Sequence, residues 1–193
     1  RSNHASLVHL SVSDKRLCDQ HTFSKQITVG EGSMGWVDSD HGILLLHNLF
    51  DDGHPVIDLI SFPVPNVGFP GEDGNYHCAP EYFYDVASCD DGLIKFVEIK
   101  RDDENFLTRG KGWRATVWNM RLSWDGWQKR CTVHVDDISI DQSYSALLPE
   151  LLDDEHQLLE LKHLLFINPT LSIQDDHLLY IRALVKAHDA TTG

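Results

Sequence analysis

The chain has 193 residues, 41% of them hydrophobic, which is enough for one domain with a substantial core or for a piece of a larger protein. Sixteen basic residues against thirty acidic ones give a formal net charge of −14, which disfavours nucleic acid as a partner, because phosphate-binding surfaces need clustered Lys and Arg. No apolar run reaches the roughly 18 residues of a spanning helix and no signal-peptide pattern is visible, so we expect no membrane partner and a cytoplasmic or nuclear location.

The chain divides into a weakly patterned N-terminal strand region, residues 1–34, and a single all-β domain, residues 35–193. Within this domain a unit of strand, acidic or Gly-containing turn and second strand occurs four times, over residues 35–48, 84–99, 117–135 and 169–183. After each turn the chain becomes apolar, as in the ILLL that follows the first turn. This pattern predicts antiparallel strand pairs.

The spacing of the turns favours blade-like β-hairpin repeats. Gly42 and Gly92 are 50 residues apart, which is near the period of roughly 40–50 residues of a four-stranded propeller blade. His177 begins the third comparable strand after a longer interval, so we assign residues 141–168 to an insertion with a short helical segment near 143–165. Three blade-like units are too few to close a propeller, which leaves a partial β-propeller and a sandwich as alternatives. The predicted fold class is all-β and mainly antiparallel.

The Trp-rich segment from Val117 to Val135 predicts a hairpin with a defined register. Asp125-Gly126 suits a two-residue type I′ turn, because both central positions of that turn need positive φ. The resulting register puts Trp118 opposite Val133. It gathers seven apolar side chains on one face, which we expect to be structural core: Trp118, Met120, Leu122, Trp124, Trp127, Cys131 and Val133.

On the other face of this hairpin the same register places Arg121 directly opposite Arg130. Like charges in directly opposed positions are unfavourable. We therefore expect a carboxylate from a neighbouring strand or from a partner beside them, and the alternative is that both side chains extend into water.

A long stretch rich in Pro and Gly, residues 63–82, shows no periodicity. Such a stretch is uncommon in a compact domain and is either functional or disordered. Aromatic side chains on a loop suit the anchoring of a protein partner. The candidate partner-binding residues are Phe69, Tyr76, His77 and Tyr82, and the alternative is a disordered loop without function.

The sequence offers no strong catalytic or metal-binding motif. A group of carboxylates and imidazoles lacks the fixed spacing of known metal motifs, so solvated turns explain it more simply: Asp38, Asp40, His41, His47, Asp51, Asp52 and His54. No nucleophile elbow and no phosphate-binding glycine loop occurs. The four cysteines, at 18, 78, 89 and 131, form no CxxC pair and are typical of free thiols. We predict no catalytic residue, no cofactor and no metal.

Several motifs, taken in order, resemble one plant family. They are GWVDSDHGILL from Gly35, DGLIKFVEI from Asp91, the Trp-rich hairpin with its flanks from Trp113, and PTLSIQDDHLLYI from Pro169. Over about three-quarters of the chain they resemble the grass-expanded domain-of-unknown-function family 1618. The Trp-rich hairpin followed by PTLS and an acidic turn is the most specific part of this resemblance. At His47-Asn48 the chain departs from the acid expected in the family.

The resemblance implies no assigned activity, cofactor or catalytic residue. The repeats are also similar in style to the F-box-associated propeller-like domains of plants, although no F-box is visible. We therefore expect a non-catalytic protein–protein interaction module, an adaptor or substrate-reading domain, whose partner is another protein. The rival hypothesis is a carbohydrate-binding or hydrolase-like domain that uses strand-end Asp and Trp side chains. Two convergent carboxylates in a concave pocket would favour the rival.

Overall fold

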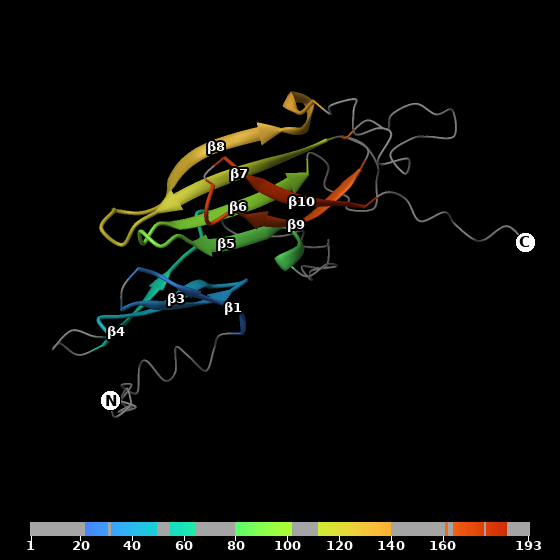
Figure 1. The fold of residues 1–193 in the computed structure, drawn as a ribbon. Helices are drawn as coiled ribbons and strands as arrows, with labels where there is room; N and C mark the ends of the chain where they lie inside the picture. Colours follow the sequence, from blue (N-terminus) through green and yellow to red (C-terminus); the bar gives the residue numbers. More distant parts are fainter. Residues whose placement is uncertain are drawn as a thin grey trace, which may run out of the picture.

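The structure is a computed structural model that describes residues 22–30, 32–49, 55–64, 80–101, 112–139, 161, 164–175 and 177–184. These residues form three antiparallel β-sheets (Figure 1). The first sheet contains, in spatial order, β1 (Phe23–Thr28), β2 (Met34–Asp38), β3 (Gly42–His47) and β4 (Val56–Ile60). The second contains β5 (Tyr84–Ser88), β6 (Ile94–Arg101), β7 (Trp113–Met120) and β8 (Gln128–His134). The third pairs β9 (Leu165–Leu171) with β10 (Leu179–Leu184).

The predicted all-β, mainly antiparallel class is confirmed. The helical segments among the described residues are all 3-10 turns: η1 (Pro80–Tyr82), η2 (Val135–Asp137) and the turn to which Leu161 belongs. The three sheets do not close into a ring within the described part of the chain. Of the segment 143–165, where we predict a short helix, only residues 161, 164 and 165 are described, so the rest of that prediction lies outside the described residues.

The second sheet is the middle layer of the molecule, because its alternate side chains enter two different cores. One face packs against the first sheet, with Val86, Ile94 and Phe96 against Ile27 and other residues of β1–β3. The opposite face packs against the third sheet and buries residues of β5, β6 and β7 with Leu171 of β9. This two-sided burial explains why four successive residues of β6, from Ile94 to Val97, are all buried, as is typical of a strand covered on both faces.

One carboxylate connects the first strands of all three sheets. Asp85 of β5 accepts a hydrogen bond from Lys25 Nζ of β1 at 2.7 Å, and its other oxygen accepts one from the Leu171 backbone N–H of β9 at 2.9 Å. Lys25 Nζ also donates to the Val86 carbonyl at 2.7 Å. The strands β1, β5 and β9 therefore lie beside one another at corresponding positions in successive sheets, as Figure 1 also shows.

The turn spacing of 50 residues is not the structural repeat. Gly42 lies between β2 and β3, whereas Gly92 lies between β5 and β6. The position that corresponds to Gly92 in the first sheet is the β1–β2 turn, where Gly30 comes within contact distance of Gly92. The boundary between residues 34 and 35 falls inside β2, which pairs with β1.

The predicted register of the Trp-rich hairpin is wrong. Val133 pairs with Ala115 and not with Trp118, and β7 and β8 are joined through residues 121–127 and not through a two-residue Asp125-Gly126 loop. The slip equals three residues up to the register shift at Val117/Trp118 and four beyond it, and an odd slip moves the side chains of one strand to the opposite face. Trp118 therefore faces the first sheet, while Val133 faces the side of the third sheet.

The new register divides the seven predicted core residues. Trp118 and Trp127 pack against the core between the first two sheets, and Met120 and Trp124 are half-buried. The predicted burial is wrong for Leu122, at 45% exposed, for Val133, at 40% exposed, and for Cys131, which is also exposed. Leu122 lies in the connecting loop, and neither described strand of the third sheet covers Cys131 and Val133 on β8.

Candidate functional site

The β7–β8 loop, residues 121–127, is held between the first two sheets by two contacts from its ends. Arg121 donates from Nη1 to the Asp91 carbonyl oxygen at 2.6 Å, and its Nη2 forms an ion pair with the Asp91 carboxylate. The hydrogen bond from Arg121 holds the pKa of Asp91 below its usual value. The predicted carboxylate beside Arg121 is therefore present and comes from the β5–β6 turn. The predicted pairing of Arg121 with Arg130 is wrong, because Arg121 lies outside the paired part of the hairpin.

Trp127 holds the other end of the loop. Its indole N–H donates to the Ser61 carbonyl oxygen at 2.8 Å, just beyond β4, and its ring lies 5.9 Å from the Phe96 ring. Buried indole rings usually need such a partner for their N–H. These contacts explain why the loop is longer than its turn residues predict, since a tight turn at Asp125-Gly126 would withdraw Trp127 from the first sheet.

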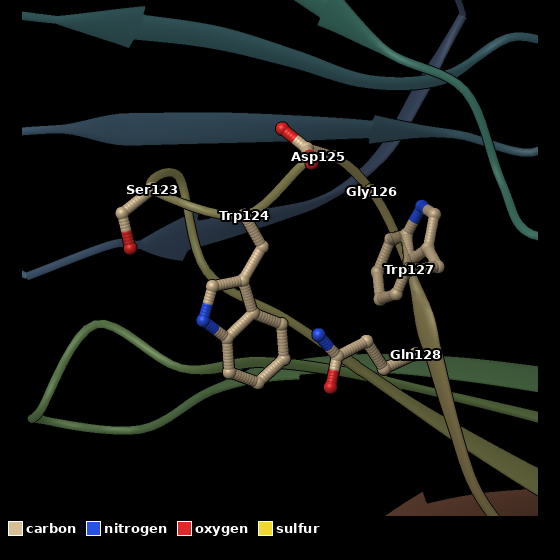
Figure 2. A pocket seen from close by; sticks show the side chains of 6 residues that line it. All are labelled: Ser123, Trp124, Asp125, Gly126, Trp127 and Gln128. Carbon is tan, nitrogen blue, oxygen red and sulfur yellow. The ribbon is translucent and has the colours of Figure 1, made fainter.

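An open hollow of about 490 Å³ lies on this loop and is lined by six consecutive residues: Ser123, Trp124, Asp125, Gly126, Trp127 and Gln128. Figure 2 shows that the Trp124 indole and the Asp125 carboxylate point to opposite sides of the loop. Trp124 extends toward the β5–β6 turn, on the same side as Gln128. The lining contains a single carboxylate, so the two convergent carboxylates that would favour a hydrolase are not among the residues of this hollow.

The predicted partner-binding residues are described only at one position. Tyr82, in η1, is 43% exposed and lies next to the buried Phe83. Phe69, Tyr76 and His77 lie outside the described residues.

The outer face of the first sheet is an apolar surface that sequence reasoning missed. Its register places Trp36, Leu44 and Leu59 in one row across β2–β4, and Met34, Leu46 and Ile57 in the next. Phe23 completes it, with its ring 6.5 Å from that of Trp36. We call these seven residues the outer face. No described element packs on it; Leu59 and Phe23 are 41% and 40% exposed, whereas Leu44 between them is only 3% exposed.

A signal for this surface was present in the sequence. In β3 the run Ile43–Leu46 is apolar at every position, whereas a strand with one solvent-exposed face alternates apolar and polar residues. Ile43 and Leu45 fill the inner core, which leaves Leu44 and Leu46 for the opposite face. The uninterrupted run therefore predicts that both faces of this strand are covered.

The described members of the predicted Asp and His group lie at two separate places, the turn at Asp38 and the strand pair that contains His47. Asp38, which is 1% exposed, accepts backbone hydrogen bonds from Thr22, Asp40 and His41 and contacts the His41 ring at 3.1 Å. Burial raises the pKa of Asp38, but these hydrogen bonds together outweigh it and leave the pKa below its usual value.

His47 contacts Asp58 of the neighbouring strand at 2.8 Å, away from the Asp38 turn. Asp51, Asp52 and His54 lie outside the described residues. No group of three or more metal-ligating side chains comes together in the described ranges. Asp38 is thus a turn cap, as the sequence indicates for this segment.

Two further ionisable groups lie side by side beneath the first sheet. Tyr84 of β5 pairs with Glu98 of β6. Burial raises the pKa of Tyr84 to about 12, and burial also raises the pKa of Glu98 against the opposing effect of Lys100 and Arg114. Burial between two layers thus disfavours the charged form of both groups.

No helix in the described part of the chain is long and apolar enough to cross a membrane. Comparison with curated proteins and with solved structures finds no match. A family model described as "Protein of unknown function (DUF1618)" matches residues 36–180, which extends from β2 into β10 and includes the whole second sheet. The chain therefore belongs to the DUF1618 family of proteins of unknown function.

Proposed function

We propose that this domain is a non-catalytic protein–protein interaction module, an adaptor or substrate-reading domain of a plant protein that acts in the cytoplasm or nucleus and is similar in style to F-box-associated domains. The observation that carries the proposal is the outer face of the first sheet. In a chain with a net charge of −14, it presents apolar side chains on all four strands.

The composition of the outer face supports a protein partner. Large contiguous apolar patches on a soluble domain mark interaction sites, and aromatic anchors contribute most to such interfaces. Trp36 and Phe23 supply two aromatic rings beside each other, and the buried Asp38 is the one acidic side chain in the paired positions of this face. Tyr82 remains a second candidate anchor, on a different part of the molecule.

Affinity purification from plant leaf extract with quantitative mass spectrometry tests this proposal. The variant Leu59→Glu places a charge in the outer face at an exposed position, so the fold is preserved. The control is Ile173→Glu, at another exposed apolar position in the β9–β10 turn. We expect proteins that are enriched by the wild type and the control and lost with Leu59→Glu. Retention of every enriched protein by Leu59→Glu, or no enrichment at all, would overturn the proposal.

The hollow on the β7–β8 loop supports carbohydrate binding as a second candidate function. It combines the indole of Trp124 with the side-chain amide of Gln128 and the hydroxyl of Ser123. Sugar rings pack on aromatic faces and use such polar groups for orientation. A glycan array distinguishes the two functions, because a carbohydrate-binding domain should give signals that are lost in Trp124→Ala and kept in Leu59→Glu.

A further inference from the structure

Among the residues that the structure describes, the third sheet ends in an unpaired strand edge beside an exposed part of the second sheet. In the first two sheets the spatial order follows the chain order over four strands, whereas the described part of the third consists of β9 and β10. No other described strand pairs with β10 on its free side. An unpaired edge presents backbone N–H and C=O groups that another extended chain can bind.

The interface between the second and third sheets continues beyond β10 as exposed apolar side chains. β9 contacts β5 and β6, and in Figure 1 β10 lies on the side of β9 that is nearer to β7 and β8. Leu179 and Ile181 of β10 pack on the core that contains Ala115 of β7. On the next strand, Val133 shares the face of Ala115 but is 40% exposed. Cys131 shares this face through its pairing with Val117 and is exposed too.

A strand placed beside β10 would therefore lie over β8. Its side chains on the inner face would cover Cys131 and Val133, and those on the outer face would adjoin Tyr180 and Arg182 of β10, which are both exposed. The two observations are independent, because one concerns a backbone edge and the other concerns side chains of a different sheet. Both favour an extended segment as the occupant, with apolar and polar side chains that alternate along its length.

The local charges specify the outward side chains of that segment. β10 carries Arg182 and no acid, and β8 also carries no acid. The basic residues of β8 are Arg130 and Lys129, of which Lys129 pairs with Trp118 on the side of the first sheet. Arg130 lies at the register shift of β8, where it has no partner residue on β7. The acids that flank β8 in sequence, Asp125 in the β7–β8 loop and Asp136 and Asp137 in η2, lie beyond its two ends. Basic side chains at an edge strand favour carboxylates on the facing positions of a partner strand.

We propose that the edge of β10, together with Cys131 and Val133 of β8, binds an extended peptide segment of another protein, with apolar residues alternating with acidic ones. The peptide adds a strand to the third sheet. Its apolar side chains cover β8, and its acidic side chains face Arg182. This surface is separate from the outer face of the first sheet, so either site is tested without the other.

Selection from a displayed library of random twelve-residue peptides identifies the preferred sequences. We expect the enriched peptides to alternate apolar and acidic residues. For a selected synthetic peptide, Val133→Asp should weaken binding by about tenfold or more, since it puts a carboxylate where an apolar side chain docks. The matched control is Val56→Asp on β4, because Val56 has nearly the same exposure, 41%, on another edge strand. Its affinity for the peptide should change by less than about twofold.

The rate at which the free thiols are alkylated reports peptide binding in the unmodified protein. Peptide binding should slow alkylation of Cys131 by iodoacetamide and leave Cys89, in the β5–β6 turn, unchanged. The proposal is overturned if the enriched peptides show no alternation, if Val133→Asp binds as the wild type does, or if Cys131 is not protected. It is also overturned if Cys131 is protected by raising the concentration of the protein alone, since the occupant would then be a second copy. None of these outcomes depends on Leu59, so failure here leaves the proposed function standing.

Discussion

At the scale of single residues, the most informative group is the buried carboxylate of Asp38. It accepts backbone hydrogen bonds from three residues and contacts the His41 ring, and these bonds favour the charged form. Because its pKa is lower in the folded chain than in the unfolded one, its contribution to stability is present above the ordinary pKa of 3.8 and is lost as the pH falls below that value.

Asp38→Asn should therefore lower the free energy of unfolding at pH 7 by about 1–3 kcal/mol, because the amide replaces an acceptor-only carboxylate that serves several donors. The difference from the wild type should shrink as the pH falls toward 3. Urea titrations at pH 7 and pH 3.5 measure it. The control is the exposed neighbour Asp40→Asn, for which we expect a change within about 0.5 kcal/mol. An equal loss at both pH values would show that charge is not the cause.

Glu98 should behave in the opposite way. Its pKa is raised by burial, so the folded state binds its proton more tightly than the unfolded state does. The stability that Glu98 contributes is complete below its ordinary pKa of 4.5 and is lost as the pH rises through the raised value. We expect Glu98→Gln to be more stable than the wild type at pH 7 and no more stable at pH 4, by thermal unfolding at both pH values. A variant that is less stable at pH 7 would contradict this assignment of the cause.

At the scale of elements, the sequence predicts the existence of strands far better than their pairing. The units at 84–99 and 169–183 contain β5 with β6 and β9 with β10, because alternation and turn residues are local properties. The register of β7 and β8 depends on contacts made far away, at Ser61 and Asp91. These tertiary contacts outweigh the local preference of Asp125-Gly126 for a tight turn. No pattern within the hairpin itself carries that information.

The candidate surfaces follow the same rule. The Trp-rich loop is recognisable from its composition, and Arg121 with its carboxylate follows from charge. The outer face is visible in the sequence only through the unbroken apolar run of β3, since a run that is apolar at every position predicts burial on both faces without naming what covers them. The free edge of β10 has no sequence signal at all, because an edge is defined by the strands that are not beside it.

Two turn glycines should differ in their tolerance of alanine. Both Gly42 and Gly92 have positive φ, at +116° and +77°, so a side chain is strained at either position. At Gly42 a Cβ would also overlap the Ile60 carbonyl oxygen, whereas at Gly92 only Gly30 lies within 4 Å. We expect Gly92→Ala to cost about 1 kcal/mol and Gly42→Ala to cost about 3 kcal/mol or more, because the second must also displace β4. Denaturant titration of both variants measures the difference in the free energy of unfolding. Equal losses would mean that β4 shifts with little loss of stability.

At the scale of the whole molecule, the three sheets are of unequal strength. The first two have four strands each and share a core, while the third has two described strands and depends on its packing against β5 and β6. A two-stranded sheet is marginally stable by itself. Asp85 is therefore important for the stability of the third sheet, because its two oxygens connect β5 with Lys25 of β1 and with Leu171 of β9.

Asp85 carries two contacts of different kinds, and substitutions separate them. Lys25→Met removes the ion pair but leaves the Leu171 N–H bonded, and because Lys25 is partly exposed we expect a loss below about 1 kcal/mol. Asp85→Ala also leaves the Leu171 N–H without its acceptor, so the loss should reach about 2–3 kcal/mol. Hydrogen exchange then locates the effect. In Asp85→Ala the amides of β9 and β10 should exchange faster while those of β2 and β3 stay protected, and Lys25→Met should leave β9 and β10 unchanged. If exchange rises equally in all three sheets, the molecule opens as one cooperative unit and the third sheet is not its weakest layer.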